Sequence, residues 1–129
     1  MKYVSLNSFD DLIFEIGKHK TDDADNDLRL IENAVISFFA YFKAAVKSEL
    51  ASLLAQDYPD RDSAYEDIKA CDEACRLALD AAITNASIVN KLCSAYGVDP
   101  VFLGNINDRN EVAEFCREFV EQTFLNREL

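Results

Sequence analysis

The sequence predicts an all-α fold: an up-down antiparallel bundle of four helices, two of them long, in a single domain over residues 1–129. Hydrophobic residues recur at spacings of three and four residues along most of the chain, which is the period of an amphipathic helix. Only three Gly and two Pro occur, too few for the many turns of a β-sandwich or barrel. The links between the predicted helices are short, and short links place neighbouring helices antiparallel.

The first two helices are predicted over about residues 8–18 and 25–56. In the first, one face is formed by Phe9, Leu12, Ile13 and Ile16. The acidic stretch 22–27 opens the second helix, where carboxylates stabilise the positive end of a helix dipole. Pro59 cannot continue that helix. The second helix has one apolar stripe, which Glu49 interrupts; it consists of Leu28, Ile31, Val35, Phe38, Phe42, Ala45, Val46 and Leu53.

The third helix is predicted to begin with the capping box Ser63-Ala64-Tyr65-Glu66 and to stop at Gly97. Asp108, with Glu111 three residues later, predicts the start of a fourth helix over about residues 109–125. The third helix carries two apolar stripes. Asp72 interrupts the first, which consists of Ile68, Cys75, Leu79, Ala82, Ala86, Val89, Cys93 and Tyr96. The second consists of Ala70, Ala74, Leu77, Ala81, Ile88, Leu92 and Ala95.

The second stripe of the third helix predicts an interface, because a helix that is apolar on two sides is usually buried on both. A first helix of about eleven residues cannot cover two helices of more than thirty. We therefore expect a homodimer in which this stripe takes part. The alternative is intramolecular: the second and fourth helices would flank the third on opposite sides and hide both stripes.

A polar spot inside the bundle is predicted at Glu49, Asp72 and Arg76. Antiparallel packing through the link near Pro59 sets residue 49 beside residue 70 or 71, and both acids lie in apolar stripes. Two carboxylates in a poorly solvated seam cannot both ionise cheaply, so one would hold its proton more tightly. In the alternative, each acid reaches the bundle edge and pairs with Lys69 or Arg76.

No known catalytic arrangement matches the candidate residues. His19 follows Glu15 by one turn, but nothing in the sequence supplies the orienting group that a catalytic His needs. Asp23, Asp25 and Asp27 match alternate ligands of a calcium loop, yet the residues that loop requires at its sixth and twelfth positions are missing. The three Gly are isolated, so no phosphate-binding loop is present. We expect no catalytic residues, no bound metal and no cofactor.

The four cysteines are predicted to be free thiols in a soluble, cytoplasmic protein, since the first residues do not resemble a secretory signal. Cys71 and Cys75 are one helical turn apart, whereas Cys93 lies 18 residues further on, roughly 27 Å along a helix. An antiparallel fourth helix would bring Cys116 near Cys93. The thiols then form two separated pairs rather than one zinc site.

The charge excludes two classes of partner. With 24 acidic and 13 basic residues the net charge is −11, which repels nucleic acid and anionic membranes. The leading hypothesis is a non-catalytic protein that acts through protein–protein interaction or self-association. The alternative is an acidic nucleic-acid mimic of the anti-defence type, which docks to a basic groove of a partner and requires one contiguous acidic face. A third is a small-ligand binder in the bundle core.

The stretch from Cys75 to Arg127 contains a set of polar and aromatic positions: Arg76, Asp80, Asn90, Gly97, Asp108-Arg109 and the pattern from Phe115 to Phe124. In these residues the stretch resembles a small uncharacterised family of bacterial all-helical proteins, of the domain-of-unknown-function kind. The family has a His just before the Asp, where this chain has Leu79. The resemblance implies a helical fold and a bacterial source, and it implies no particular activity.

Overall fold

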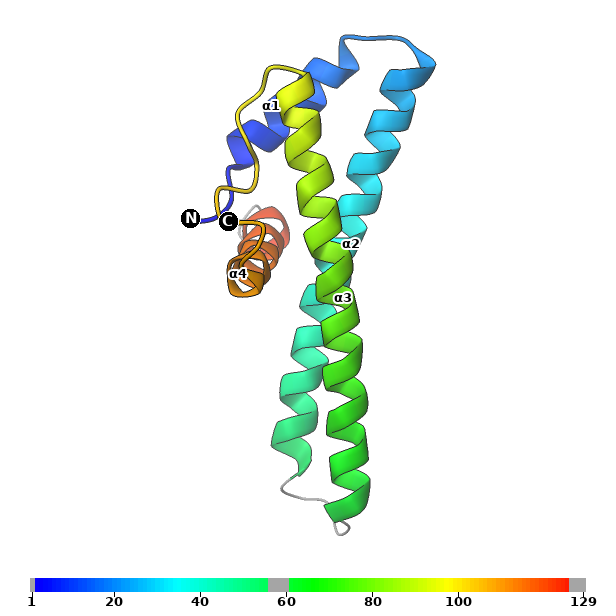
Figure 1. The fold of residues 1–129 in the computed structure, drawn as a ribbon, viewed down its shortest axis with the longest axis vertical. Coiled ribbons are helices and arrows are strands. Elements are labelled where there is room, and N and C mark those ends of the chain that lie inside the picture. The colour runs from blue at the N-terminus through cyan, green and yellow to red at the C-terminus, as the bar shows by residue number, and fades with distance from the viewer. Residues whose placement is uncertain (1, 56–60, 126–129) are drawn as a thin grey trace.

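The computed structural model describes residues 2–55 and 61–125 and is all-helical there, which confirms the predicted fold class. Four α-helices follow one another: α1 (Leu6–Gly17), α2 (Asp22–Leu54), α3 (Arg61–Ala95) and α4 (Arg109–Val120). A short π-helical segment, η2 (Glu121–Leu125), continues α4 (Figure 1). The predicted link around Pro59 and the predicted helix end at Gln56 lie outside the described residues.

Side-chain caps explain where three of the helices begin. Ser5 accepts a hydrogen bond from the Ser8 amide and Thr21 from the Ala24 amide, so α1 and α2 begin two and three residues earlier than the apolar pattern predicts. Asp108 caps α4 as predicted, because its carboxylate accepts from the amide of Glu111.

The capping box predicted for the third helix was wrong. That motif needs its first residue outside the helix, and α3 already begins at Arg61, two residues before Ser63. The predicted end at Gly97 is confirmed. Gly97 has a φ of 70°, and the amide of Val98 donates to the Cys93 carbonyl at 2.8 Å. The Gly97 amide donates to Ser94, which completes a Schellman motif.

The two long helices form an antiparallel hairpin, and α1 and α4 pack against one half of it (Figure 1). The Ser48 hydroxyl donates to the Asp72 carboxylate at 2.7 Å, which confirms the predicted register near residues 49 and 71. The up-down order holds for α2 and α3 but not for α4. In Figure 1 α4 is seen almost end-on while the hairpin runs along the long axis, so α4 crosses the hairpin.

Long-range hydrogen bonds fix the direction of α4. The Asn90 side chain accepts from the amides of Val101 and Phe102 and donates to the Phe102 carbonyl. The amide of Leu103 donates to the Tyr3 carbonyl at 2.9 Å. Glu118 on α4 in turn accepts from the Tyr3 amide at 2.8 Å. The segment after α3 is therefore bound to the N-terminal residues, and α4 starts from there across the hairpin.

The hydrophobic core lies where α1 and α4 cover the hairpin. Phe38 of α2 meets Phe115 and Phe119 of α4 in edge-to-face contacts, with ring centroids 4.9 and 5.4 Å apart. Leu12 and Ile16 of α1 are fully buried in the same cluster. The core therefore occupies one half of the molecule.

The other half of the hairpin extends beyond α1 and α4 (Figure 1). We call it the arm and define it as residues 43–54 of α2 and 61–77 of α3. Among the side chains that the structure describes in the arm, only Ala64 is buried. The apolar stripe predicted on the second helix is accordingly divided: Ile31 and Phe38 are in the core, whereas Val46 and Leu53 are exposed.

Candidate functional site

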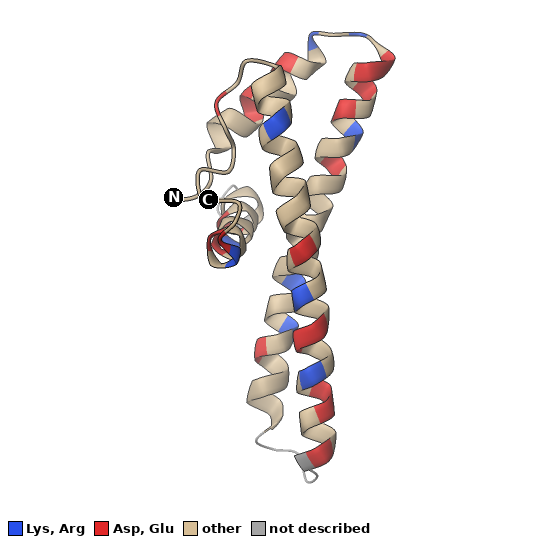
Figure 2. Ribbon diagram, in the orientation of Figure 1, with Lys and Arg blue, Asp and Glu red and all other residues tan. Residues whose placement is uncertain are grey.

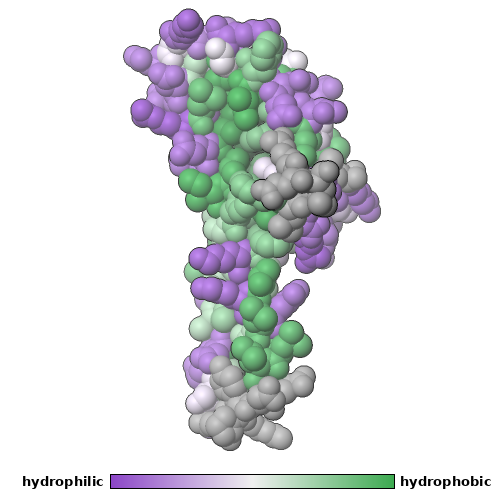
Figure 3. Space-filling model, turned by 180° about the vertical axis from the view of Figure 1, so that it is seen from behind, coloured by the Kyte–Doolittle hydropathy of each residue, from purple (hydrophilic) through white to green (hydrophobic). Residues whose placement is uncertain are grey.

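The arm exposes large hydrophobic side chains along its length. Leu53 is 64 % exposed, Leu54 and Leu77 are each 54 % exposed, and Val46, Leu50 and Tyr65 are also in contact with solvent. Figure 3 shows hydrophobic residues at the surface along this half of the molecule. Apolar surface left in water costs about 25 cal/mol per Å², and contiguous patches of it mark interaction sites. The arm is therefore the candidate functional site.

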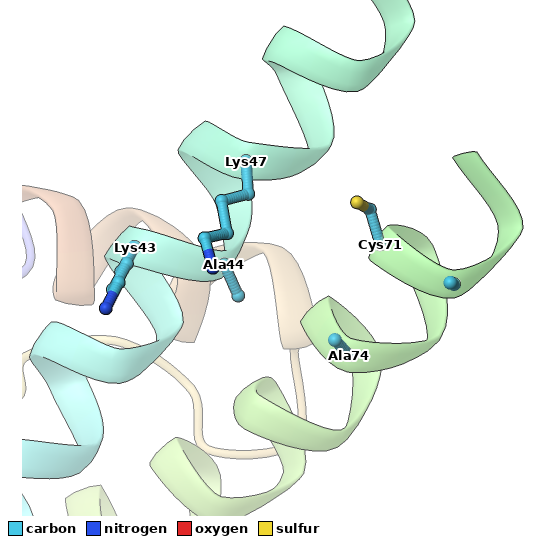
Figure 4. Close-up of a pocket in the computed structure, with 6 residues that line it drawn as sticks. Lys43, Ala44, Lys47, Cys71 and Ala74 are labelled. Carbon is cyan, nitrogen blue, oxygen red and sulfur yellow. The ribbon is translucent and has the colours of Figure 1, made fainter. Parts of the chain in front are cut away.

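One face of the arm has a groove between the two helices, with a volume of about 390 Å³. It is lined by Lys43, Ala44, Lys47, Ala70, Cys71 and Ala74. In Figure 4 Cys71 and Ala74 of α3 lie across the groove from the lining residues of α2. We call it the alanine groove. Three of the six lining residues are alanines, which let another helix approach closely on that side.

A second groove lies between the arm and the end of α4. It is lined by Phe42, Ala45, Val46, Glu49, Arg117 and Glu121. These α2 residues continue the helix face that α4 covers in the core, so the second groove begins where the cover by α4 ends.

The predicted interface stripe on the third helix is exposed over most of its length. Ala70, Ala74, Leu77, Ala81 and Ala95 are open to solvent. The intramolecular alternative, in which α2 and α4 hide both stripes, is therefore wrong for these residues. Leu92 instead packs against the core of its own chain, and Ile88 is half-buried.

The predicted polar spot inside the bundle does not form. Glu49, Asp72 and Arg76 are all exposed. Asp72 accepts from Ser48, and Arg76 pairs with Glu73 at 2.6 Å and Asp80 at 3.6 Å. Glu49 lies in the groove beside the end of α4, and all three side chains remain exposed to solvent.

A hydrogen bond that the sequence does not reveal joins the residue that follows α3 to the N-terminal part of α2. The Tyr96 hydroxyl donates to the Asp27 carboxylate at 2.6 Å, and this bond raises the pKa of Tyr96. His19 is exposed and its ring lies 5.9 Å from the Tyr96 ring. Glu15 pairs with Lys18. Glu15 and His19 thus each contact a different residue, Lys18 and Tyr96 respectively.

The cysteines lie in two different environments. Cys71 and Cys75 are half-buried, whereas Cys93 and Cys116 are buried. Burial raises the pKa of Tyr41, and the neighbouring thiols of Cys75 and Cys116 raise it further. Within residues 2–55 and 61–125, no group of three or more His, Cys, Asp or Glu side chains could hold a metal ion.

Burial also raises the pKa of the Cys116 thiol, to about 12 from the ordinary value of 9.0. The unfolded chain loses this proton above pH 9 while the folded chain keeps it, so folding stability falls as the pH rises from 9 towards 12. The slope from one such group is at most about 1.4 kcal/mol per pH unit. We expect urea unfolding of Cys116→Ala to show a shallower alkaline loss than the unmodified chain. Cys71→Ala, at a half-buried site, is the control and should keep the full slope; equal slopes in both variants would contradict the prediction.

Acidic residues are spread over every helix rather than gathered on one face. Figure 2 shows them at the top of the hairpin, on α4 and along α3, with Lys and Arg among them in the arm. Some are locally neutralised: Asp80 pairs with Arg109 of α4 at 2.6 Å as well as with Arg76. In the arm, acidic and basic residues are thus interspersed along α2 and α3.

Sequence reasoning missed the α2 side of the alanine groove. Lys43 and Lys47 belong to a row that also contains Ile36, Ala40, Leu50 and Leu54, all of which are exposed. Their spacing alternates between four and three residues and was the available signal. The row is not a purely hydrophobic stripe, because Lys43 and Lys47 occupy two of its positions.

None of the described helices combines the length and the apolar character that crossing a membrane requires. Comparison with models of protein families, with curated proteins and with solved structures found no match.

Proposed function

We propose that this chain is a non-catalytic protein that acts through protein–protein contact, with the arm as its docking element. The observation that carries the proposal is the contrast between the two halves of the hairpin. One half is closed by α1 and α4 around a phenylalanine core, whereas the arm keeps Leu50, Leu53, Leu54 and Leu77 in contact with solvent. The simplest occupant of the arm is a second copy, as the sequence predicts.

The chemistry of the described residues supports a non-catalytic role. The single His is exposed and rests near Tyr96, and the carboxylates of the arm are solvated or paired with neighbouring cations. The phenylalanine core is closely packed by edge-to-face contacts, which favours protein contact at the surface over a small ligand in the core. The spread of acidic residues favours general solvation over a mimic of nucleic acid.

Site-specific photocrosslinking tests the proposal. We would place a benzophenone side chain at Leu54 of the arm and, as a matched control, at Phe14 of α1, which is 65 % exposed. The probe at Leu54 should form adducts with protein, in the purified chain at high concentration or in an extract of the source cells. Adducts at Leu54 no more abundant than those at Phe14 would overturn the proposal.

A further inference from the structure

We propose that the alanine groove is covered by a second copy of this chain, related by a twofold axis parallel to the hairpin, so that α2 of each copy packs on α3 of the other. This inference rests on the proposed function, because it takes the arm as the docking element, and it names the occupant and its orientation. Three properties of the exposed hairpin face support it: spacing, size and charge.

The spacing on both helices is that of a helical-bundle seam, in which inward positions alternate between four and three residues. On α2 these positions are Ile36, Ala40, Lys43, Lys47, Leu50 and Leu54. On α3 they are Ala70, Ala74, Leu77, Ala81, Thr84, Ile88, Lys91 and Ala95. All are exposed except Ile88, which is half-buried. A four-helix seam needs this pattern on four helices. One chain supplies it on two, α2 with 33 residues and α3 with 35.

The size of the side chains differs between the two rows. The α2 row has large residues, with Ile36 58 % and Leu50 51 % exposed, whereas the α3 row is mostly alanine in the arm. Close packing of helices is best where large side chains of one face small side chains of the other. Setting α2 against α3 of the partner satisfies this condition. Setting α2 against α2 would place large side chains against each other.

The charges at the edges select the same arrangement. Glu73 borders the alanine row, since it lies three residues after Ala70 and four before Leu77. The bond between Ser48 and Asp72 places their neighbours, Lys47 and Glu73, at the same level of the hairpin. Rotation about a twofold axis parallel to the hairpin leaves each residue at the same height along the hairpin. It places α2 of one copy opposite α3 of the other. Lys47 then meets the partner's Glu73, and this happens twice in each dimer.

A second pair near the other end of the hairpin repeats the relation with the signs reversed. The bond between Tyr96 and Asp27 places Glu32 of α2 at the level of Lys91 of α3. Both residues are exposed, and Lys91 lies in the α3 row itself, between Ile88 and Ala95. The same axis therefore brings Glu32 to the partner's Lys91. The charged side chains on this face of one copy are therefore complementary to those of a second copy.

The area of the face is sufficient for a stable dimer. At 1.5 Å per residue the hairpin is about 50 Å long, and two packed helices are roughly 20 Å wide. The face then measures on the order of 1,000 Å², compared with the roughly 800 Å² per partner of a standard protein interface.

Charge reversal in separate and mixed chains tests the orientation by sedimentation velocity. Lys47→Glu alone places like charges opposite each other twice in the dimer, and so does Glu73→Lys alone. Each variant should dimerise at least tenfold more weakly than the unmodified chain. An equimolar mixture of the two pairs opposite charges at both contacts, so the dimer should return in the mixture, and also in the double variant. Lys18→Glu, the same charge change at the residue that follows α1, is the control and should leave dimerisation unchanged.

The contrary outcomes are distinct. Tighter dimerisation of Lys47→Glu would show α2 packed on α2 and overturn the orientation. Weakened single variants with no recovery in the mixture would overturn it as well, as would single variants that dimerise like the unmodified chain. An unmodified chain that stays monomeric while Leu54 crosslinks to another protein would overturn the second copy and leave the proposed function standing. A monomer without crosslinks would overturn both.

Discussion

Phe115→Ala is expected to lower the free energy of unfolding by about 3–5 kcal/mol, the range for a large aromatic side chain removed from a core. Phe115 is fully buried, and its ring centroid lies 4.9 Å from that of Phe38 and 5.0 Å from that of Phe102. It thereby joins α4 to α2 and to the segment after α3. Urea unfolding followed by circular dichroism, at one fixed protein concentration, measures the loss.

The matched control is Phe14→Ala, because Phe14 is mostly exposed. The Lys18 ammonium group lies over its ring, 4.9 Å from the ring centroid. Its loss should be under about 1 kcal/mol. Similar losses in both variants would contradict the position of the core. A large loss confined to Phe115→Ala would place the stabilising core where α4 meets α2 and the segment after α3.

Ala81→Glu is expected to weaken dimerisation by about a hundredfold or more while the monomer stays folded. Ala81 is exposed in the row that also contains Ala74 and Leu77, so a longer side chain meets no cover within its own chain. In the dimer two carboxylates would be buried without partners, which is costly. If the row were instead hidden within the chain, the same substitution would unfold it.

The control for Ala81→Glu is Ser94→Glu, which adds the same charge to an exposed position of α3 away from the alanine row. Its dimer should be as stable as that of the unmodified chain, and thermal unfolding at equal concentration should show all three chains folded. Equal weakening by both substitutions would mean that charge on α3 acts in general rather than at this row.

The helices could be predicted from the sequence because their signals are local. The cap at Asp108 and the stop at Gly97 each depend on residues within a few positions, and the antiparallel register follows from the length of the link. The crossing of α4 could not be predicted in this way. It depends on Asn90 and Glu118, whose hydrogen bonds reach Val101, Phe102 and Tyr3 far along the chain, and no periodic pattern records them.

The candidate site could be predicted only in part, because the pattern along each helix is local whereas its cover by other helices is not. A helical wheel identifies the row from Ala70 to Ala81 as apolar, but it does not say which faces another helix covers. Glu49 and Asp72 lie in apolar stripes and were expected to share a buried seam. The stripes continue into the arm, where the cover by α4 ends at the groove beside Glu49, and both carboxylates are exposed there.

Sedimentation equilibrium of the unmodified chain over a wide range of concentrations tests the central claim most directly. If the arm takes a second copy, the mass should rise with concentration from the 14.5 kDa of one chain to twice that value and stop there, because a twofold face-to-face contact closes on itself. Ala81→Glu should stay at the mass of one chain over the same range. A mass of 14.5 kDa for the unmodified chain at every concentration would contradict the claim.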